Sequence, residues 1–209
     1  PMKQVCCGAL NLHSGDVHKA LDMARRNIDI FLENDPDAII TASAGCGSTM
    51  KEYRELLSGD AAYTEKAARF SSLTRDITEF LDELPITPPS KSVIRRVTYQ
   101  DACHLLNAQG ISDAPRRILK AIPGVELVEM ENSNRCCGAA GMYTVTQQSM
   151  SKQILEIKMR CVRATKADVV VTTNPGCTIQ LESGSTQMGA NTTVCHLVDI
   201  LSESYGSPD

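Results

Sequence analysis

Long apolar runs and an excess of basic charge are both missing from this sequence. No hydrophobic stretch approaches the ~20 residues that a helix needs to cross a bilayer, so we predict no membrane-spanning helix. The formal net charge is −4, and the lysines and arginines are scattered along the chain. Nothing in this charge pattern indicates a nucleic-acid-binding surface.

Familiar catalytic arrangements are missing as well. The chain shows no nucleophile–base pair, no carboxylate dyad and no phosphate-binding loop, and the spacing of Gly45 and Gly47 is too short for a nucleotide-binding fingerprint. We therefore identify no catalytic residue from the sequence. The C-x-x-C motif that is typical of structural zinc sites is also absent.

Cysteine, by contrast, is abundant. The 209 residues include nine cysteines, an odd number. Disulfide frameworks are typical of small, loop-rich secreted chains, whereas this chain is 42% hydrophobic and rich in helix and buried-strand patterns. A reducing compartment and metal chemistry fit this usage better, with one or two of the cysteines acting as small hydrophobic core residues.

Helix and strand patterns alternate along the chain. Apolar residues recur at helical spacing, and short apolar runs indicate buried parallel strands. In the first half we predict a helix over 15–34, a strand over 38–42, a loop carrying Cys46, a helix over 50–57 and a long helix over 61–84. In the second half we predict strands over 93–100, 125–130, 168–173 and near Val194, and helices over 115–122, 143–165 and 197–205. The alternation indicates an α/β fold with mostly parallel sheets.

The two halves also repeat one another. Cys6-Cys7-Gly8 recurs as Cys136-Cys137-Gly138, and Cys46 recurs as Cys177, at offsets of 130 and 131 residues. We therefore predict two pseudo-repeated Rossmann-like units, over 1–84 and 93–209, joined by a proline-rich linker at 85–92. The first repeat is incomplete at its N-terminus. Because the chain opens with Pro1 and reaches its first motif five residues later, we expect a longer protein upstream.

Most of these cysteines follow predicted strands. In the second half this holds for Cys103, for the pair Cys136-Cys137 and for Cys177. The loops after parallel strands emerge at the carboxyl edge of the sheet, where such folds bind ligands. We therefore expect these four cysteines to converge on one site. In the first half, Cys6, Cys7 and Cys46 are expected to occupy the corresponding places.

Converging thiolates point to a metal centre. Soft sulfur ligands select zinc or iron–sulfur clusters. Adjacent cysteines bind one ion only with strain, whereas two irons of one cluster accept neighbouring thiolates more easily. Flanking glycines allow close approach of the backbone, and helices that begin after the cysteines aim N–H groups at an anionic centre. An iron–sulfur cluster is thus favoured, with zinc as the alternative and thiol–disulfide chemistry as the third reading.

The segments CCGALNLHSGD, CHLLNAQGI, CCGAAGMY and TTNPGCTIQL resemble the cysteine-rich CCG domain. This domain occurs in the iron–sulfur subunit of glycolate oxidase, in lactate-utilisation proteins and in the B subunit of heterodisulfide reductase. The four segments are most similar to the glycolate oxidase subunit. The family pattern is a Cys, a Cys-Cys-Gly and a C-x-x-C, usually present twice. The resemblance covers 4–205, and here the second copy reads Cys103, Cys136-Cys137-Gly138, Cys177.

The resemblance implies the C-terminal part of a longer, non-flavin subunit of an oxidoreductase complex, whose N-terminal half carries two ferredoxin-type motifs. It implies a cluster of the 4Fe–4S type held by Cys103, Cys136, Cys137 and Cys177. Electrons would come from a flavin subunit that oxidises a 2-hydroxy acid such as glycolate and would pass toward a quinone. The implied location is cytoplasmic, reaching the inner membrane only through partners.

This sequence also departs from the family pattern. The closing C-x-x-C is degenerate, since Thr49 and Gln180 stand where its second cysteine is expected, and the fifth cysteine of heterodisulfide reductase is missing. The first copy has three cysteines and would need a fourth ligand from upstream. A zinc-stabilised interaction scaffold and a thiol–disulfide redox subunit therefore stay as alternatives. The roles of His104, Cys161 and Cys195 are left open.

Overall fold

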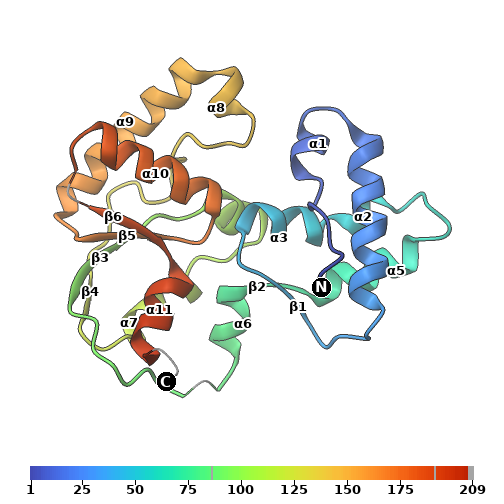
Figure 1. Ribbon diagram of the computed structural model, residues 1–209, viewed down its shortest axis with the longest axis horizontal. Helices are drawn as coiled ribbons and strands as arrows, with labels where there is room; N and C mark the ends of the chain where they lie inside the picture. The colour runs from blue at the N-terminus through green and yellow to red at the C-terminus, as the bar shows by residue number, and fades with distance from the viewer. Residues whose placement is uncertain (86, 191, 207–209) are drawn as a thin grey trace. The chain divides into compact units, whose positions relative to one another are not determined.

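The computed structural model describes residues 1–85, 87–190 and 192–206. The chain divides into two compact units, Pro1–Ile77 and Thr78–Asp209. Each unit contains a sheet whose described strands pair in parallel, and helices pack against these strands (Figure 1). The predicted pair of Rossmann-like α/β units is confirmed.

The second unit is built on a four-stranded sheet with the order β4-β3-β5-β6. Its strands are β3 (Arg95–Tyr99), β4 (Val125–Leu127), β5 (Val169–Thr172) and β6 (Thr193–His196). β5 is buried along its whole length, which explains its uninterrupted apolar sequence. Because all four strands run in one direction, the loops that follow β3, β4 and β5 emerge at one edge of the sheet.

Helices cover both faces of this sheet. One face carries α9 (Gln148–Thr165) and α10 (Pro175–Gln187), and the other carries α7 (Ala114–Ala121) and α11 (Leu197–Tyr205) (Figure 1). The alternation of strand side chains explains the two cores. Val171 of β5 packs with α7 and α11, whereas its neighbour Val170 packs with α9 and α10. No described helix has the length and apolar character of a bilayer span.

The first unit is smaller and mostly helical. Its elements are α1 (Ala9–His13), α2 (Val17–Leu32), β1 (Ile39–Thr41), α3 (Ala44–Lys51), α4 (Tyr53–Leu56), α5 (Thr64–Leu73) and β2 (Thr74–Asp76). Ile28, Tyr53 and Phe70 are fully buried in its core, where the rings of Tyr53 and Phe70 stack with their centroids 5.2 Å apart. This packing holds α2, α4 and α5 together beneath the two-stranded sheet.

The prediction of one long helix over 61–84 is wrong. The chain forms α5, then the strand β2, then α6 (Ile77–Glu83). β2 pairs in parallel with β1, and Thr74 and Asp76 are fully buried. The helical periodicity correctly indicated helices before and after residues 74–76, which form α5 and α6. Pairing with β1 decided the extended conformation of the three residues between these helices.

Three other predicted boundaries shift. The helix expected over 50–57 already begins at Ala44, so Cys46 lies in a helix rather than in a loop. The helix expected over 143–165 is broken at Gln147 into α8 (Tyr143–Thr146) and α9. β4 ends at Leu127, which leaves an eight-residue loop, 128–135, before the second Cys-Cys-Gly.

The division between the two units falls at Ile77 and Thr78, before the proline-rich segment 85–92. Leu81 of α6 packs against the core of the second unit, and Asp82 forms an ion pair with Arg117 of α7. Thus α6 and the segment that follows it group with the second unit. Residue 86 of that segment lies outside the described residues.

Candidate metal centre

Three loops at the carboxyl edge of the second sheet carry the predicted cysteines. Cys103 follows β3 and precedes η1 (His104–Ala108), a π-helical turn of a kind often found at functional sites. Cys136 and Cys137 lie at the end of the loop after β4. Cys177 is the third residue of α10, which begins three residues after β5 ends.

The four thiols form one row, in which Cys103 lies beside Cys136, Cys136 beside Cys137, and Cys137 beside Cys177, and each thiol shifts the pKa of its neighbour. Cys137 and Cys177 are buried, with 1% and 5% of their surfaces exposed, whereas Cys103 and Cys136 are half-buried. The structure therefore brings together the four cysteines that the sequence predicted to converge.

The direction of the pKa shift alternates along this row. The neighbouring thiols of Cys103 and Cys137 hold the pKa of Cys136 well below that of an ordinary thiol. The Cys137 thiol likewise lowers the pKa of Cys177, although burial opposes it. The same neighbours, together with burial, raise the pKa of Cys103 and of Cys137. A lowered pKa favours the thiolate, which is the form that binds metals.

Nitrogen donors surround the sulfurs. The Gly138 N–H donates to Cys136 Sγ at 3.3 Å, and Asn174 Nδ2 donates to Cys177 Sγ at 3.5 Å. The ring nitrogen Nδ1 of His104 lies 3.6 Å from Cys103 Sγ. The side-chain bond of Asn174 to sulfur has no sequence signal beyond its position three residues before Cys177.

Tight packing shapes the backbone next to the cysteine pair. Gly138 has a φ of +92°, and a Cβ there would lie 2.5 Å from the Ser151 carbonyl oxygen. Ser151 Oγ donates to the Gly138 carbonyl at 2.8 Å, and Gln180 Nε2 donates to Ser151 Oγ at 3.1 Å. Glycine is therefore required here by both conformation and space. Ser151, which the sequence did not single out, connects α9 and α10 to this loop.

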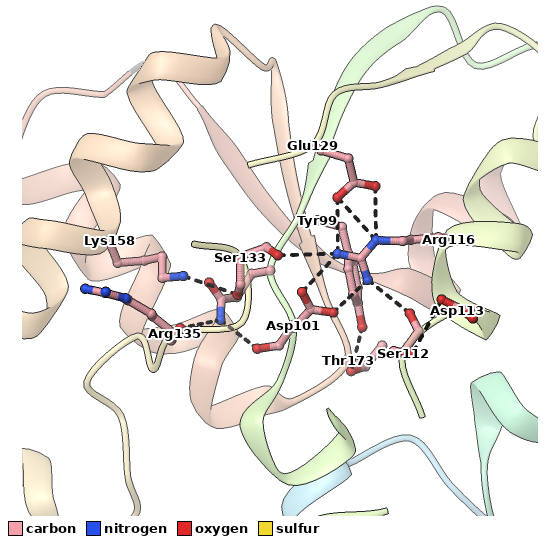
Figure 2. A network of polar contacts seen from close by, with 11 residues as sticks. Tyr99, Asp101, Ser112, Asp113, Arg116, Glu129, Ser133, Arg135, Lys158 and Thr173 are labelled. Atoms are coloured by element: carbon pink, nitrogen blue, oxygen red, sulfur yellow. Dashed lines mark hydrogen bonds and ion pairs between the residues drawn. The ribbon is translucent and has the colours of Figure 1, made fainter. Parts of the chain in front are cut away.

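Arg116 of α7 joins the loop of Cys103 to the loop of the cysteine pair. Its guanidinium donates to both carboxylate oxygens of Asp101, at 2.8 and 2.9 Å, and to the carboxylate of Glu129 (Figure 2). It also lies over the ring of Tyr99, 5.1 Å from the centroid. Burial raises the pKa of Asp101, but the hydrogen bonds from Arg116 and Ser133 outweigh it and keep that pKa low.

Hydrogen bonds to backbone carbonyls join the same two loops. The Asp101 N–H donates to the Ser133 carbonyl at 3.2 Å, and Gln100 Nε2 donates to the Arg135 carbonyl at 3.2 Å. Together with Arg116, these bonds set the position of Cys103 relative to Cys136.

The first unit repeats part of this arrangement. Cys46 is the third residue of α3, as Cys177 is of α10, and it lies beside Cys7. The Cys7 thiol lowers the pKa of Cys46 to about 6, while Cys46 and burial raise the pKa of Cys7. Cys6 is exposed. The structure thus places Cys7 and Cys46 together as it places Cys137 and Cys177, and a ligand role for these cysteines stays a prediction.

A family model for a cysteine-rich domain, designated CCG, matches residues 1–51 and 97–182, which together include both cysteine sites. The chain belongs to this CCG domain family. The two matched segments correspond to the two repeats, and each contains one of the Cys-Cys-Gly loops.

Curated relatives of this CCG protein agree with the match. It is 41% identical over 210 residues to the probable glycolate oxidase iron-sulfur subunit of Bacillus subtilis and 32% identical to the glycolate oxidase iron-sulfur subunit of Escherichia coli. It is 30% identical to lactate utilization protein A of Geobacillus kaustophilus. These alignments cover 95–99% of this chain. The chain spans about half the length of the two glycolate oxidase relatives (47% and 48%) and 84% of the third.

Two further cysteines of the second unit do not join the row. Cys195 of β6 packs with the core on the α7 and α11 face, opposite the face that contains Cys137 and Cys177, and burial raises its pKa to about 12. Cys161 of α9 is half-buried and lines a cavity of about 230 Å³ that also contacts Cys136.

The residues of this edge that could ligate a metal are the four thiols of the row. Among the described residues, no three His, Cys, Asp or Glu side chains are arranged to hold a metal ion in their present positions.

Proposed function

We propose that Cys103, Cys136, Cys137 and Cys177 hold an iron–sulfur cluster. The observation that carries the proposal is the row of four neighbouring thiols, supplied by the three segments that follow β3, β4 and β5 at one sheet edge. The donor set fits the group, because all four donors are soft sulfurs and N–H groups already point at Cys136 and Cys177. We assign the 4Fe–4S type, in which each of four thiolates binds one iron.

The chain is, in this proposal, the cysteine-rich part of an electron-transfer subunit in a complex that oxidises a 2-hydroxy acid such as glycolate. The names of the two glycolate oxidase relatives support this assignment. When bound, the cluster would supply one-electron transfer between a flavin subunit and a quinone-side acceptor. This subunit contributes no catalytic residue of its own. It works in the cytoplasm and meets the inner membrane only through its partners.

For the first site we propose a weaker role. Cys6, Cys7 and Cys46 form an incomplete set, because the second site has a fourth cysteine, Cys103, that has no counterpart in residues 1–77. A cluster here would need another ligand from outside these residues. The Cys7–Cys46 contact supports a site that is preserved in shape but short of one donor.

Metal analysis tests the proposal directly. The protein would be purified without oxygen and assayed for iron, acid-labile sulfide and zinc. We expect about four iron and four sulfide per chain, with the cluster absorbance and electron paramagnetic resonance spectra of a reducible centre. C136S should lose these signals. C161S, which changes a neighbouring half-buried cysteine outside the row, is the matched control and should keep them.

Other outcomes would select the alternatives. Stoichiometric zinc without sulfide would replace the electron-transfer role with a zinc-stabilised scaffold. Reversible disulfide formation in place of metal uptake would favour a thiol–disulfide redox subunit. An unchanged cluster spectrum in C136S would remove Cys136 from the ligand set and with it this assignment.

A further inference from the structure

Lys158 of α9 is a charged residue buried beside the row of thiols. Only 2% of its surface is exposed, which is unusual for lysine, because burying an ammonium group costs free energy unless it is compensated. Its Nζ donates to the Asn132 carbonyl at 2.6 Å and to the Ser133 carbonyl at 3.2 Å. Lys158 thereby holds the loop that leads into Cys136 and Cys137.

Acidic groups lie close to this ammonium group. Burial lowers the pKa of Lys158, and neighbours that include Asp101 and Cys136 act in the opposite direction. Lys158 also forms part of the wall of the cavity that contacts Cys136 and Cys161. Figure 2 shows its side chain directed at the loop around Ser133, on the other side of which Arg116 holds Asp101. The loop is therefore held from both sides.

The first repeat has an equivalent residue. Asn27 of α2 precedes Lys158 by 131 residues, the same offset that separates Cys46 from Cys177. Its Nδ2 donates to the Val5 carbonyl at 3.3 Å and to the Cys6 carbonyl at 3.1 Å, while its Oδ1 accepts from the Val5 N–H. Both repeats thus use one helix position to bind the backbone that leads into Cys-Cys-Gly.

The two equivalents differ in charge. The site with three cysteines has a neutral asparagine at this position, whereas the site with four has a lysine. If hydrogen bonding were the whole task, the neutral amide would be sufficient, as it is in the first repeat. The lysine adds a positive charge at the place where more thiolates gather, and a buried charge interacts strongly with its neighbours because water does not screen it.

We propose that Lys158 is a positioning residue of the second cysteine site, which holds the Cys136-Cys137 loop through its two carbonyl bonds and offsets the negative charge of the thiolate-bound centre. The charge part of this inference rests on the proposed iron–sulfur function. The positioning part does not, because it is argued from the two carbonyl bonds alone.

The positioning part is tested on the whole chain without cluster, by amide hydrogen exchange of residues 131–138. K158M should exchange about tenfold faster over these residues, since it loses two charge-assisted hydrogen bonds. K158R should stay close to wild type, and K158Q, which keeps an N–H donor, should show a smaller increase. K152M, which changes an exposed lysine of the same helix, is the control and should show none. Equal exchange in wild type, K158M and K158Q overturns the positioning role, and K158Q decides it should K158M fail to fold.

The charge part is tested by the reduction potential of the reconstituted cluster. A nearby positive charge stabilises the reduced form, which carries the extra electron. We expect K158Q and K158M to shift the reduction equilibrium about tenfold toward the oxidised form, equivalent to ~59 mV for one electron, and K158R to restore it. The same potential in K158Q and K158R would overturn the charge role. A wild-type chain that takes up no iron would refute the proposed function instead, while the exchange experiment would still decide the positioning role.

Discussion

The two Cys-Cys-Gly loops share an inner pair of cysteines and differ in what surrounds that pair. Cys7 lies beside Cys46 in the first unit as Cys137 lies beside Cys177 in the second. The inner pair is the part that both repeats retain, because in each it is set by a strand that leads into a helix N-terminus and by a buried glycine turn.

The outer half of the site is present only in the second unit. Cys136 is half-buried and lies beside Cys103, whereas its equivalent Cys6 is exposed. The second unit also has the ionic contacts of Arg116 and Lys158, which fix the two loops that carry the outer cysteines. In this chain the unit with four motif cysteines has charged side chains around their loops, while the loop of the unit with three is held by the neutral amide of Asn27.

The largest expected difference is in iron content. C137S and C7S remove equivalent inner cysteines from the two sites. If only the second site holds a cluster, C137S should lose essentially all cluster iron and C7S should keep it, as measured by iron and sulfide analysis of oxygen-free protein. Equal iron losses in the two variants would show that both sites are filled, and the two units would then not differ in cluster content.

Next comes the glycine that follows each cysteine pair. G138A should destabilise the chain by about 3 kcal/mol, because positive φ strains alanine and its Cβ would meet the Ser151 carbonyl at 2.5 Å. G8A should cost about 1–2 kcal/mol, since its nearest contact is Ala20 at 3.1 Å. Urea unfolding measures both. G110A is the control for backbone strain alone, because Gly110 has a positive φ and no atom within 4 Å of the added Cβ. If G138A lost no more unfolding free energy than G110A, the contact with the Ser151 carbonyl would contribute nothing to the cost.

A smaller effect is expected for the framework around the outer cysteines. R116M leaves the Asp101 carboxylate, which is 6% exposed, without its ion partner and should cost about 2 kcal/mol in unfolding free energy. The matched control is R117M, which removes a more exposed ion pair with Asp82 from the same helix and should cost less than about 1 kcal/mol. Similar losses in the two variants would argue against a framework role for Arg116.

Much of the architecture could be predicted from local sequence. The apolar run at 169–172 and the amphipathic patterns of α2 and α9 identified strands and helices, and the offset between the two Cys-Cys-Gly motifs identified the repeat. The convergence of Cys103, Cys136 and Cys177 followed from one rule, that loops after parallel strands share an edge. The strands and helices could be predicted because their patterns lie within short segments, and the convergence of the cysteines because parallel strands all end at one sheet edge.

Other features had no such local signal. The conversion of 74–76 into β2 depends on a partner strand more than thirty residues away, and its sequence, Thr-Arg-Asp, has no strand pattern. The break at Gln147 and the early start of α3 at Ala44 are likewise decided by packing. Lys158 looked like an ordinary helix lysine, since nothing in its neighbours along the chain shows that its ammonium group meets two loop carbonyls.

The sequence alone thus determined the fold class, the repeat and the identity of the seven cysteines in the two motifs, because strand and helix periods and cysteine spacing are properties of the chain itself. The tertiary structure decided which cysteines lie beside one another, that Cys195 lies on the opposite face of the sheet, and that Arg116 and Lys158 hold the loops of the second site. Those facts depend on where side chains from distant segments meet, and the distances that govern hydrogen bonds and charge interactions exist only once the chain has folded.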